Sequence, residues 1–189
     1  THELERVLGD LDLQRKAELP LAQVIDGARL DAIGGVGEKA VHQGIAAAVW
    51  PLDQPHFDVF LDDIKSGLDQ RNPARVRLLL LDQISDPRNF GAILRSAQAF
   101  GVAGVITTFR HAANENGVLA RAASGALDHV PLVRVVNLAR AIDKIRYHGF
   151  FVAGLAGDGN AEVSSLGSHK HLAIILGAEG SGLRHLSRA

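Results

Sequence analysis

The chain contains no cysteine, which excludes disulfide bonds and thiolate metal sites. It has no apolar run of membrane-spanning length and no basic-then-apolar leader at its start. These absences predict a soluble, cytoplasmic protein. Methionine is absent too, and because a complete gene product begins with one, we expect these 189 residues to be a processed or trimmed chain.

Hydrophobic residues make up 47% of the chain, enough for the core of one domain or of two small ones. The net charge of −1 conceals an uneven distribution, since residues 1–70 hold 6 Lys and Arg against 13 Asp and Glu, whereas residues 71–189 hold 14 against 8. A basic excess of this kind attracts polyanions. A solvated surface without a partner would show the same balance, so charge alone leaves both interpretations open.

The sequence divides into three parts. Residues 1–52 combine a helix-like stretch, a glycine-rich turn and a short strand, residues 53–74 form a linker with a short amphipathic helix, and residues 75–189 form the main domain. In the main domain, apolar runs alternate with helical patterns. We expect strands at residues 76–81, 102–107, 130–135, 150–155 and 172–176, and helices at residues 87–100, 114–123 and 138–148.

Strands that are apolar on both faces and alternate with helices predict an α/β fold, a parallel sheet with helices on both faces. Ligands of such sheets bind beyond the carboxyl ends of the strands. The loops that follow Leu81, Leu155 and Leu176 should therefore lie along one rim.

The loop after Leu81, DQISDPRNFG, leads into a helix that Asp86 can cap. Arg88 and Arg95 lie seven residues apart and share a helix face with small neighbours. Two guanidinium groups with room beside them suit a planar anion such as a phosphate or a carboxylate. A pair of solvated arginines is the alternative that this feature alone leaves open.

The other two rim loops are rich in glycine and carry an acid. LAGDGNAE (155–162) contains Asp158, and ILGAEGSGL (175–183) contains Glu179. Neither matches a phosphate-binding glycine motif, and a carboxylate would repel phosphate. Plain turns are possible, but such loops also suit hydroxyls, amines or a cationic ligand, so the rim could hold a neutral or cationic cofactor beside an anionic substrate.

Two long motifs also carry a family resemblance. DQISDPRNFGAILRSAQAFG resembles the first signature motif of the SpoU (TrmH-type) family of RNA ribose 2′-O-methyltransferases, in the SPOUT class, and LAIILGAEGSGL resembles the second. NENGVLARAASGALDHVPLVRVVNL follows the family between them, and AVHQGIAAAV resembles the L30e-like, ribosomal-protein-like domain that precedes some members. The similarity covers nearly all of residues 76–189 and, more thinly, residues 1–52.

The resemblance implies a trefoil-knotted SPOUT methyltransferase domain over residues 75–189, preceded by a partial RNA substrate-binding domain over residues 1–52. The implied catalytic positions are Asn89, Arg95 and Glu179. The implied contacts of the cofactor, S-adenosylmethionine, are Gly154, Leu155, Leu176, Gly177 and Gly180. The implied contacts of the RNA substrate are Arg88, Arg121 and Ser124.

Family members are homodimers whose active site draws residues from both subunits, so the resemblance implies a homodimer. The extra N-terminal domain favours large-subunit (23S) ribosomal RNA as substrate, because compact transfer-RNA members tend to lack it. A transfer-RNA 2′-O-methyltransferase is an alternative. The family's third motif completes the knot and is expected after Ala189, so its absence leaves a catalytically inactive RNA-binding relative open as well.

Two further classes are disfavoured. A nucleotide-binding oxidoreductase needs a phosphate-cradling loop that the chain does not have. His169 and His171 have metal-like spacing, but no matching cluster of acids or cysteines accompanies them. We therefore expect no metal site.

Overall fold

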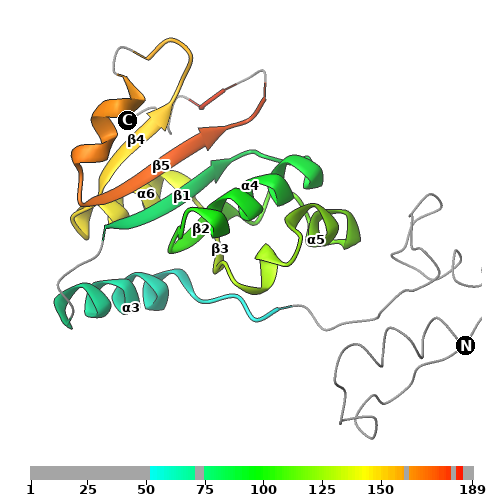
Figure 1. Cartoon of the computed structure of the whole chain (residues 1–189), viewed down its shortest axis with the longest axis horizontal. Coiled ribbons are helices and arrows are strands. Elements are labelled where there is room, and N and C mark those ends of the chain that lie inside the picture. Colours follow the sequence, from blue (N-terminus) through cyan, green and yellow to red (C-terminus); the bar gives the residue numbers. More distant parts are fainter. Residues whose placement is uncertain (1–51, 71–74, 160–161, 180–181, 185–189) are drawn as a thin grey trace, which may run out of the picture. The chain divides into compact units, whose positions relative to one another are not determined.

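The computed structural model describes residues 52–70, 75–159, 162–179 and 182–184 (Figure 1). The expected RNA-binding domain, Gly180 and the expected knot segment lie outside these ranges, so those statements stay predictions. In the described ranges, no helix has the length and apolar character needed to cross a membrane.

Five parallel strands form one sheet: β1 (Val76–Asp82), β2 (Gly104–Thr108), β3 (Leu132–Val135), β4 (Phe151–Leu155) and β5 (His171–Gly177). Their order across the sheet is β3-β2-β1-β5-β4. The first and last of these five strands, β1 and β5, are therefore neighbours in the sheet (Figure 1). The predicted parallel sheet is confirmed, and each strand overlaps its predicted range.

Helices cover both faces of this sheet, as predicted: α3 (Phe57–Gln70), α4 (Pro87–Ala99), α5 (Gly117–Ala123) and α6 (Leu138–Tyr147). Side chains of α3 and α6 share one buried cluster with Leu78 and Leu80 of β1. Side chains of α4 and α5 share a second cluster with Leu81, which points to the opposite face because strand side chains alternate. Two short 3-10 helices, η1 (Ala126–Asp128) and η2 (Val163–Ser168), complete the fold.

Helix α3 contains the amphipathic pattern expected within residues 53–74. Its apolar positions Phe57, Phe60 and Leu61 are buried in the core, with Leu61 only 1% exposed. The helix is thus anchored to the sheet by burial of apolar surface. The division of the chain into domains remains a prediction.

Polar caps determine where two helices near the rim begin. The Asp86 carboxylate accepts a hydrogen bond from the Arg88 N–H at 2.8 Å, and Pro87 occupies the first helical position of α4. The Asn116 side chain accepts from the N–H groups of Val118 and Leu119, so α5 starts three residues later than predicted. Sequence periodicity detects a helix more reliably than its first residue, because a cap breaks the pattern.

Candidate active site

Four of the five predicted cofactor residues lie at the carboxyl ends of β4 and β5. Leu155 of β4 lies beside Leu176 of β5, and Gly177 lies beside Asp82 of β1. Gly154 is one residue earlier on β4, in register with β5. The carboxyl ends of these three strands form what we call the central rim, which agrees with the rim expected from the sequence.

Two predicted catalytic residues contact each other at this rim. Asn89 lies in the first turn of α4 and donates from Nδ2 to Oε2 of Glu179 at 3.2 Å. Glu179 follows β5, so the contact joins segments 90 residues apart in the sequence. Both side chains are exposed to solvent. The two sequence motifs are therefore brought together in space, next to the strand ends.

The two predicted anion-binding arginines lie on the same helix. Arg88 and Arg95 are exposed, and neither guanidinium makes an ion pair or a hydrogen bond with another residue in the described part of the chain. Their charges are thus available to a ligand in solution. Arg95 lies on the same helix as Asn89 but makes no hydrogen bond with Asn89 and no ion pair with Glu179.

Helices α4 and α5 approach each other closely at Gly91. A Cβ atom added to Gly91 would lie 2.6 Å from the Cβ of Ala122 and 2.8 Å from the backbone N of Ala123. This contact brings α5, with its exposed Arg121, beside α4. Ser124 caps α5 in a left-handed conformation, with φ of 49°, and its hydroxyl donates to the Arg121 carbonyl oxygen. Two of the three predicted RNA contacts, Arg121 and Ser124, are therefore adjacent at the end of a helix packed against the predicted catalytic helix.

The loop after β5 folds back on itself immediately. Gly177 has no room for a side chain, because an added Cβ would collide with the backbone of Gly182 and Leu183. Gly182 donates its N–H to the Ala178 carbonyl oxygen at 2.9 Å. Leu183 is then only 5% exposed and belongs to the core on the α3 and α6 side of the sheet. Glu179 is thus held at the tip of a loop with both ends fastened.

An ion pair that sequence inspection missed fastens the same loop. Asp82 ends β1 and is completely buried, at 0% exposure. Its carboxylate is 2.8 Å from Nε and 2.6 Å from a terminal nitrogen of Arg184, and it also accepts the Arg184 backbone N–H at 3.3 Å. This pair joins the end of β1 to the loop after β5. An aspartate directly after the run of four leucines in β1 was the one available indication in the sequence.

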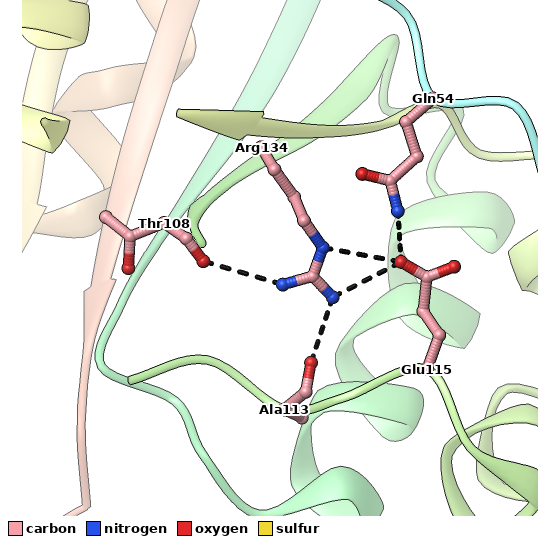
Figure 2. A network of polar contacts seen from close by, with 5 residues as sticks. All are labelled: Gln54, Thr108, Ala113, Glu115 and Arg134. Atoms are coloured by element: carbon pink, nitrogen blue, oxygen red, sulfur yellow. Dashed lines mark hydrogen bonds and ion pairs between the residues drawn. The ribbon is translucent and has the colours of Figure 1, made fainter. Parts of the chain in front are cut away.

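A second polar network, also missed, lies where β2 and β3 end (Figure 2). The Arg134 guanidinium donates to the Ala113 carbonyl oxygen at 3.0 Å and to the Thr108 carbonyl oxygen at 3.5 Å. It also pairs with the Glu115 carboxylate at 3.2 Å, and Gln54 donates to the same carboxylate. The network ties together both ends of the loop after β2.

The histidines considered for metal binding contact aromatic rings instead. His169 stacks on Phe151 with ring centroids 3.7 Å apart, and His171 contacts Phe150 at 5.6 Å. Burial and the nearby charges of Lys170 and Arg77 lower the pKa of His171. Among the described residues, no three His, Asp or Glu side chains are grouped to hold a metal ion.

The profile of the SpoU rRNA Methylase family matches residues 77–189, which contain every site residue predicted from the sequence. The chain belongs to the SpoU rRNA methylase family. A TrmH family tRNA/rRNA methyltransferase of Staphylococcus haemolyticus is 36% identical over 179 residues, or 95% of this chain and 68% of that protein. A protein of the same description from Staphylococcus aureus is 37% identical over 88% of this chain and 63% of its own length.

A solved SpoU structure shares the fold of this family member. The SpoU methyltransferase AviRb from Streptomyces viridochromogenes, in complex with the cofactor AdoMet, matches with a TM-score of 0.54 and 28% sequence identity. The match covers 60% of this chain and 45% of AviRb. The chain thus spans about two thirds of the Staphylococcus relatives and less than half of this structural neighbour.

Proposed function

We propose that this SpoU family member transfers a methyl group from S-adenosylmethionine to a ribose 2′-hydroxyl of RNA, with 23S ribosomal RNA as the favoured substrate. Family membership supports RNA methyl transfer. The observation that supports this site most directly is the contact between Asn89 and Glu179. Asn89 lies on α4, which also presents the exposed Arg95. An RNA substrate also agrees with the basic balance of residues 71–189.

The residues at the ends of β4 and β5 fit S-adenosylmethionine. Gly154, Leu155 and Gly177 are exposed or half-buried, so their backbone groups are accessible to a ligand. The nearby Glu179 carboxylate is exposed and suits a cationic group such as a sulfonium. AviRb, a relative with bound AdoMet, supports the same cofactor here. When bound, the cofactor supplies an electrophilic methyl group.

The side chains at the rim then have distinct roles. An arginine guanidinium offers only hydrogen-bond donors, so Arg95 acts as a clamp on an RNA phosphate and stabilises the negative charge that develops on the 2′-oxygen. Asn89 and Glu179 hold each other and orient the hydroxyl through the remaining donor and acceptor of the pair. The hydroxyl proton passes to water in this scheme. Alignment of the hydroxyl with the methyl group is the main contribution of the protein.

The homodimer, the cytoplasmic location and the preference for ribosomal RNA are parts of the same proposal. The homodimer and the preference for ribosomal RNA rest on the family resemblance, and the cytoplasmic location rests on the composition of the sequence. The Staphylococcus relatives are described for both transfer RNA and ribosomal RNA, so transfer RNA is the alternative substrate to test.

The role of Arg95 gives the sharpest test of the proposed site. In the full-length protein, Arg95→Ala should reduce methyl transfer about 100-fold or more with little change in cofactor affinity, because the clamp acts on the substrate. Arg95→Lys should restore little, since a point charge cannot replace a two-pronged guanidinium. Arg146→Ala is the matched control, because Arg146 is an exposed arginine on α6, across the sheet. Near-normal turnover of Arg95→Ala would remove Arg95 from the mechanism.

The substrate assignment is tested with isotopically labelled S-adenosylmethionine and the full-length protein. Ribosomal RNA and transfer RNA are incubated separately, and labelled nucleosides are identified after digestion. A label on a ribose of ribosomal RNA supports the proposal. A label on a base, or on transfer RNA alone, would replace the corresponding part of it.

A further inference from the structure

The loop after β2 presents three consecutive side chains to solvent. Phe109 is 61% exposed, and Arg110 and His111 are exposed beside it. The Arg110 guanidinium makes no hydrogen bond or ion pair with any residue in the described ranges. One exposed aromatic ring is ordinary on a protein surface, but a ring beside an available cation offers a stacking face and a phosphate ligand together.

The backbone of this loop is firmly held, although its side chains are not. Figure 2 shows the Arg134 guanidinium between the Thr108 carbonyl, the Ala113 carbonyl and the Glu115 carboxylate. The Arg134 and Glu115 side chains are only 11% and 20% exposed, so this pair is shielded from water. Thr108 precedes the exposed residues, and Ala113 and Glu115 follow them. The network fixes both ends of the loop without using the side chains of residues 109–111.

His111 adds a conformational indication. Its φ angle is 60°, in the left-handed region that a residue with a Cβ atom adopts at a steric disadvantage. The Thr108 hydroxyl also donates to the Arg110 carbonyl oxygen within the turn. The loop therefore keeps a strained and specific shape at its exposed tip. Such strain is typical of segments whose shape serves binding.

The loop borders the candidate active site. The Ala113 N–H donates to the Ile84 carbonyl oxygen at 3.1 Å, which joins the loop after β2 to the loop after β1. The loop after β1 leads directly into α4, which presents Arg88 and Asn89 in its first turn. A ligand that reaches Asn89 and Arg95 would thus extend towards residues 109–111.

We infer that Phe109, Arg110 and His111 form an RNA-contact loop that binds nucleotides flanking the methylated ribose. An exposed aromatic ring stacks on unpaired bases, and an unpaired arginine contacts phosphate, which is how proteins recognise single-stranded RNA. Arg134 is a positioning residue for this loop, because its own charge is neutralised by Glu115. RNA is a better fit than a protein partner, since a polyanion can pair with Arg88, Arg95 and Arg110 together. The inference rests on the proposed RNA substrate and extends the site beyond the residues of the two motifs.

The test compares variants of the full-length protein for binding to a single-stranded RNA oligonucleotide and to ribosomal RNA over a series of salt concentrations. Phe109→Ala and Phe109→Leu should weaken RNA binding about tenfold at every salt concentration, because both remove the stacking ring. Phe109→Tyr keeps the ring and should bind almost normally. Arg110→Ala should reduce the slope of log affinity against log salt by about one, as expected for one lost phosphate contact.

Arg134→Ala tests the positioning role, and Arg146→Ala is the control for loss of an arginine charge elsewhere. Arg134→Ala should weaken RNA binding and raise the KM for RNA while the affinity for S-adenosylmethionine stays unchanged. Arg146→Ala should leave both affinities and the folded structure as they are. Circular dichroism of each variant checks that the sheet is intact.

Several outcomes would overturn the inference. Unchanged RNA affinity and salt slope in the Phe109 and Arg110 variants would exclude the loop from the RNA interface, as would a wild-type protein that binds no RNA. A Phe109→Ala variant that changes oligomeric mass but not RNA affinity would assign the loop to a contact between copies of the chain. If the wild type binds RNA through Phe109 but transfers no methyl group, the RNA-contact loop stands, whereas the proposed methyl transfer and the position of the loop beside a methylated ribose both fail.

Discussion

Replacing Arg184 with alanine should loosen the loop that carries Glu179. The Asp82 carboxylate is fully buried, and the Arg184 guanidinium approaches it at 2.6 and 2.8 Å. Removing one partner of a buried ion pair destabilises a protein by about 3–5 kcal/mol, because a charge is left in a poorly solvated place. The Arg184 side chain is 46% exposed, so water can replace part of the lost contact. We therefore expect the free energy of unfolding to fall by about 2 kcal/mol.

Urea and thermal unfolding of the full-length protein measure this loss. A change of about 2 kcal/mol corresponds to a midpoint roughly 4–8 °C lower for a domain of this size. Asp82→Asn and the double variant complete a mutant cycle, in which we expect a coupling of about 1–2 kcal/mol between the two positions. Lys144→Ala is the matched control, because Lys144 pairs with Asp58 at 2.6 Å on the surface, where solvent screens the contact. It should change the midpoint little.

The same variants should distinguish an effect on cofactor binding from an effect on stability. The Asp82 and Arg184 pair fastens the loop of Glu179 to β1, so Arg184→Ala should weaken S-adenosylmethionine binding about tenfold in calorimetry, equivalent to about 1.4 kcal/mol. Lys144→Ala should bind the cofactor normally. A coupling energy near zero would show that water solvates Asp82 and would refute the reasoning. Lower stability with unchanged cofactor affinity would limit the pair to a structural role.

Two further substitutions test the packing of α4 against α5 and the protonation of His171 on β5. Gly91→Ala places a Cβ atom 2.6 Å from the Ala122 Cβ, so it should push α4 away from α5. We expect the free energy of unfolding to fall by about 1–3 kcal/mol and methyl transfer to decrease. An unchanged unfolding midpoint would contradict this. Burial, assisted by the charges of Lys170 and Arg77, lowers the pKa of His171, so the unfolded chain takes up this proton more readily than the folded one. The free energy of unfolding should therefore be highest above the ordinary histidine pKa of about 6.5 and decline as the pH falls below it. His171→Gln should flatten that decline in unfolding curves recorded between pH 5 and pH 8. An unchanged decline would show that the folded ring is solvated.

The sheet could be predicted from the sequence because burial on both faces leaves continuous apolar runs. The run at residues 76–81 became β1, and its neighbour in the structure, β5, came from an equally apolar run at residues 172–176. The order of the strands could not be predicted in the same way. Apolar runs record that a strand is buried but not which strand lies beside it, and the central pairing of β1 with β5 depends on the whole chain.

The site could be predicted only where motifs carry it. Asn89 and Glu179 were placed together through the family resemblance, and their contact at 3.2 Å agrees with that placement. The ion pairs of Arg184 and Arg134 could not be predicted, since an arginine that pairs with a buried acid looks the same in sequence as a solvated one. Their partners, Asp82 and Glu115, lie 102 and 19 residues away, and only the register of the strands brings them into reach.

The contacts that define the site all depend on β5. Asn89 of α4 contacts Glu179, and Asp82 at the end of β1 contacts Arg184, so both contacts reach the segment after β5 from residues 90 and 102 positions earlier in the chain. Closing so long a loop for one side-chain contact is entropically unfavourable, so these contacts form because β5 already pairs with β1 and β4. Weakening one of them should therefore open the loop of Glu179 locally while the sheet stays paired. We therefore expect Glu179 to move before the strands separate, as the proposed binding of a cofactor and an RNA chain requires.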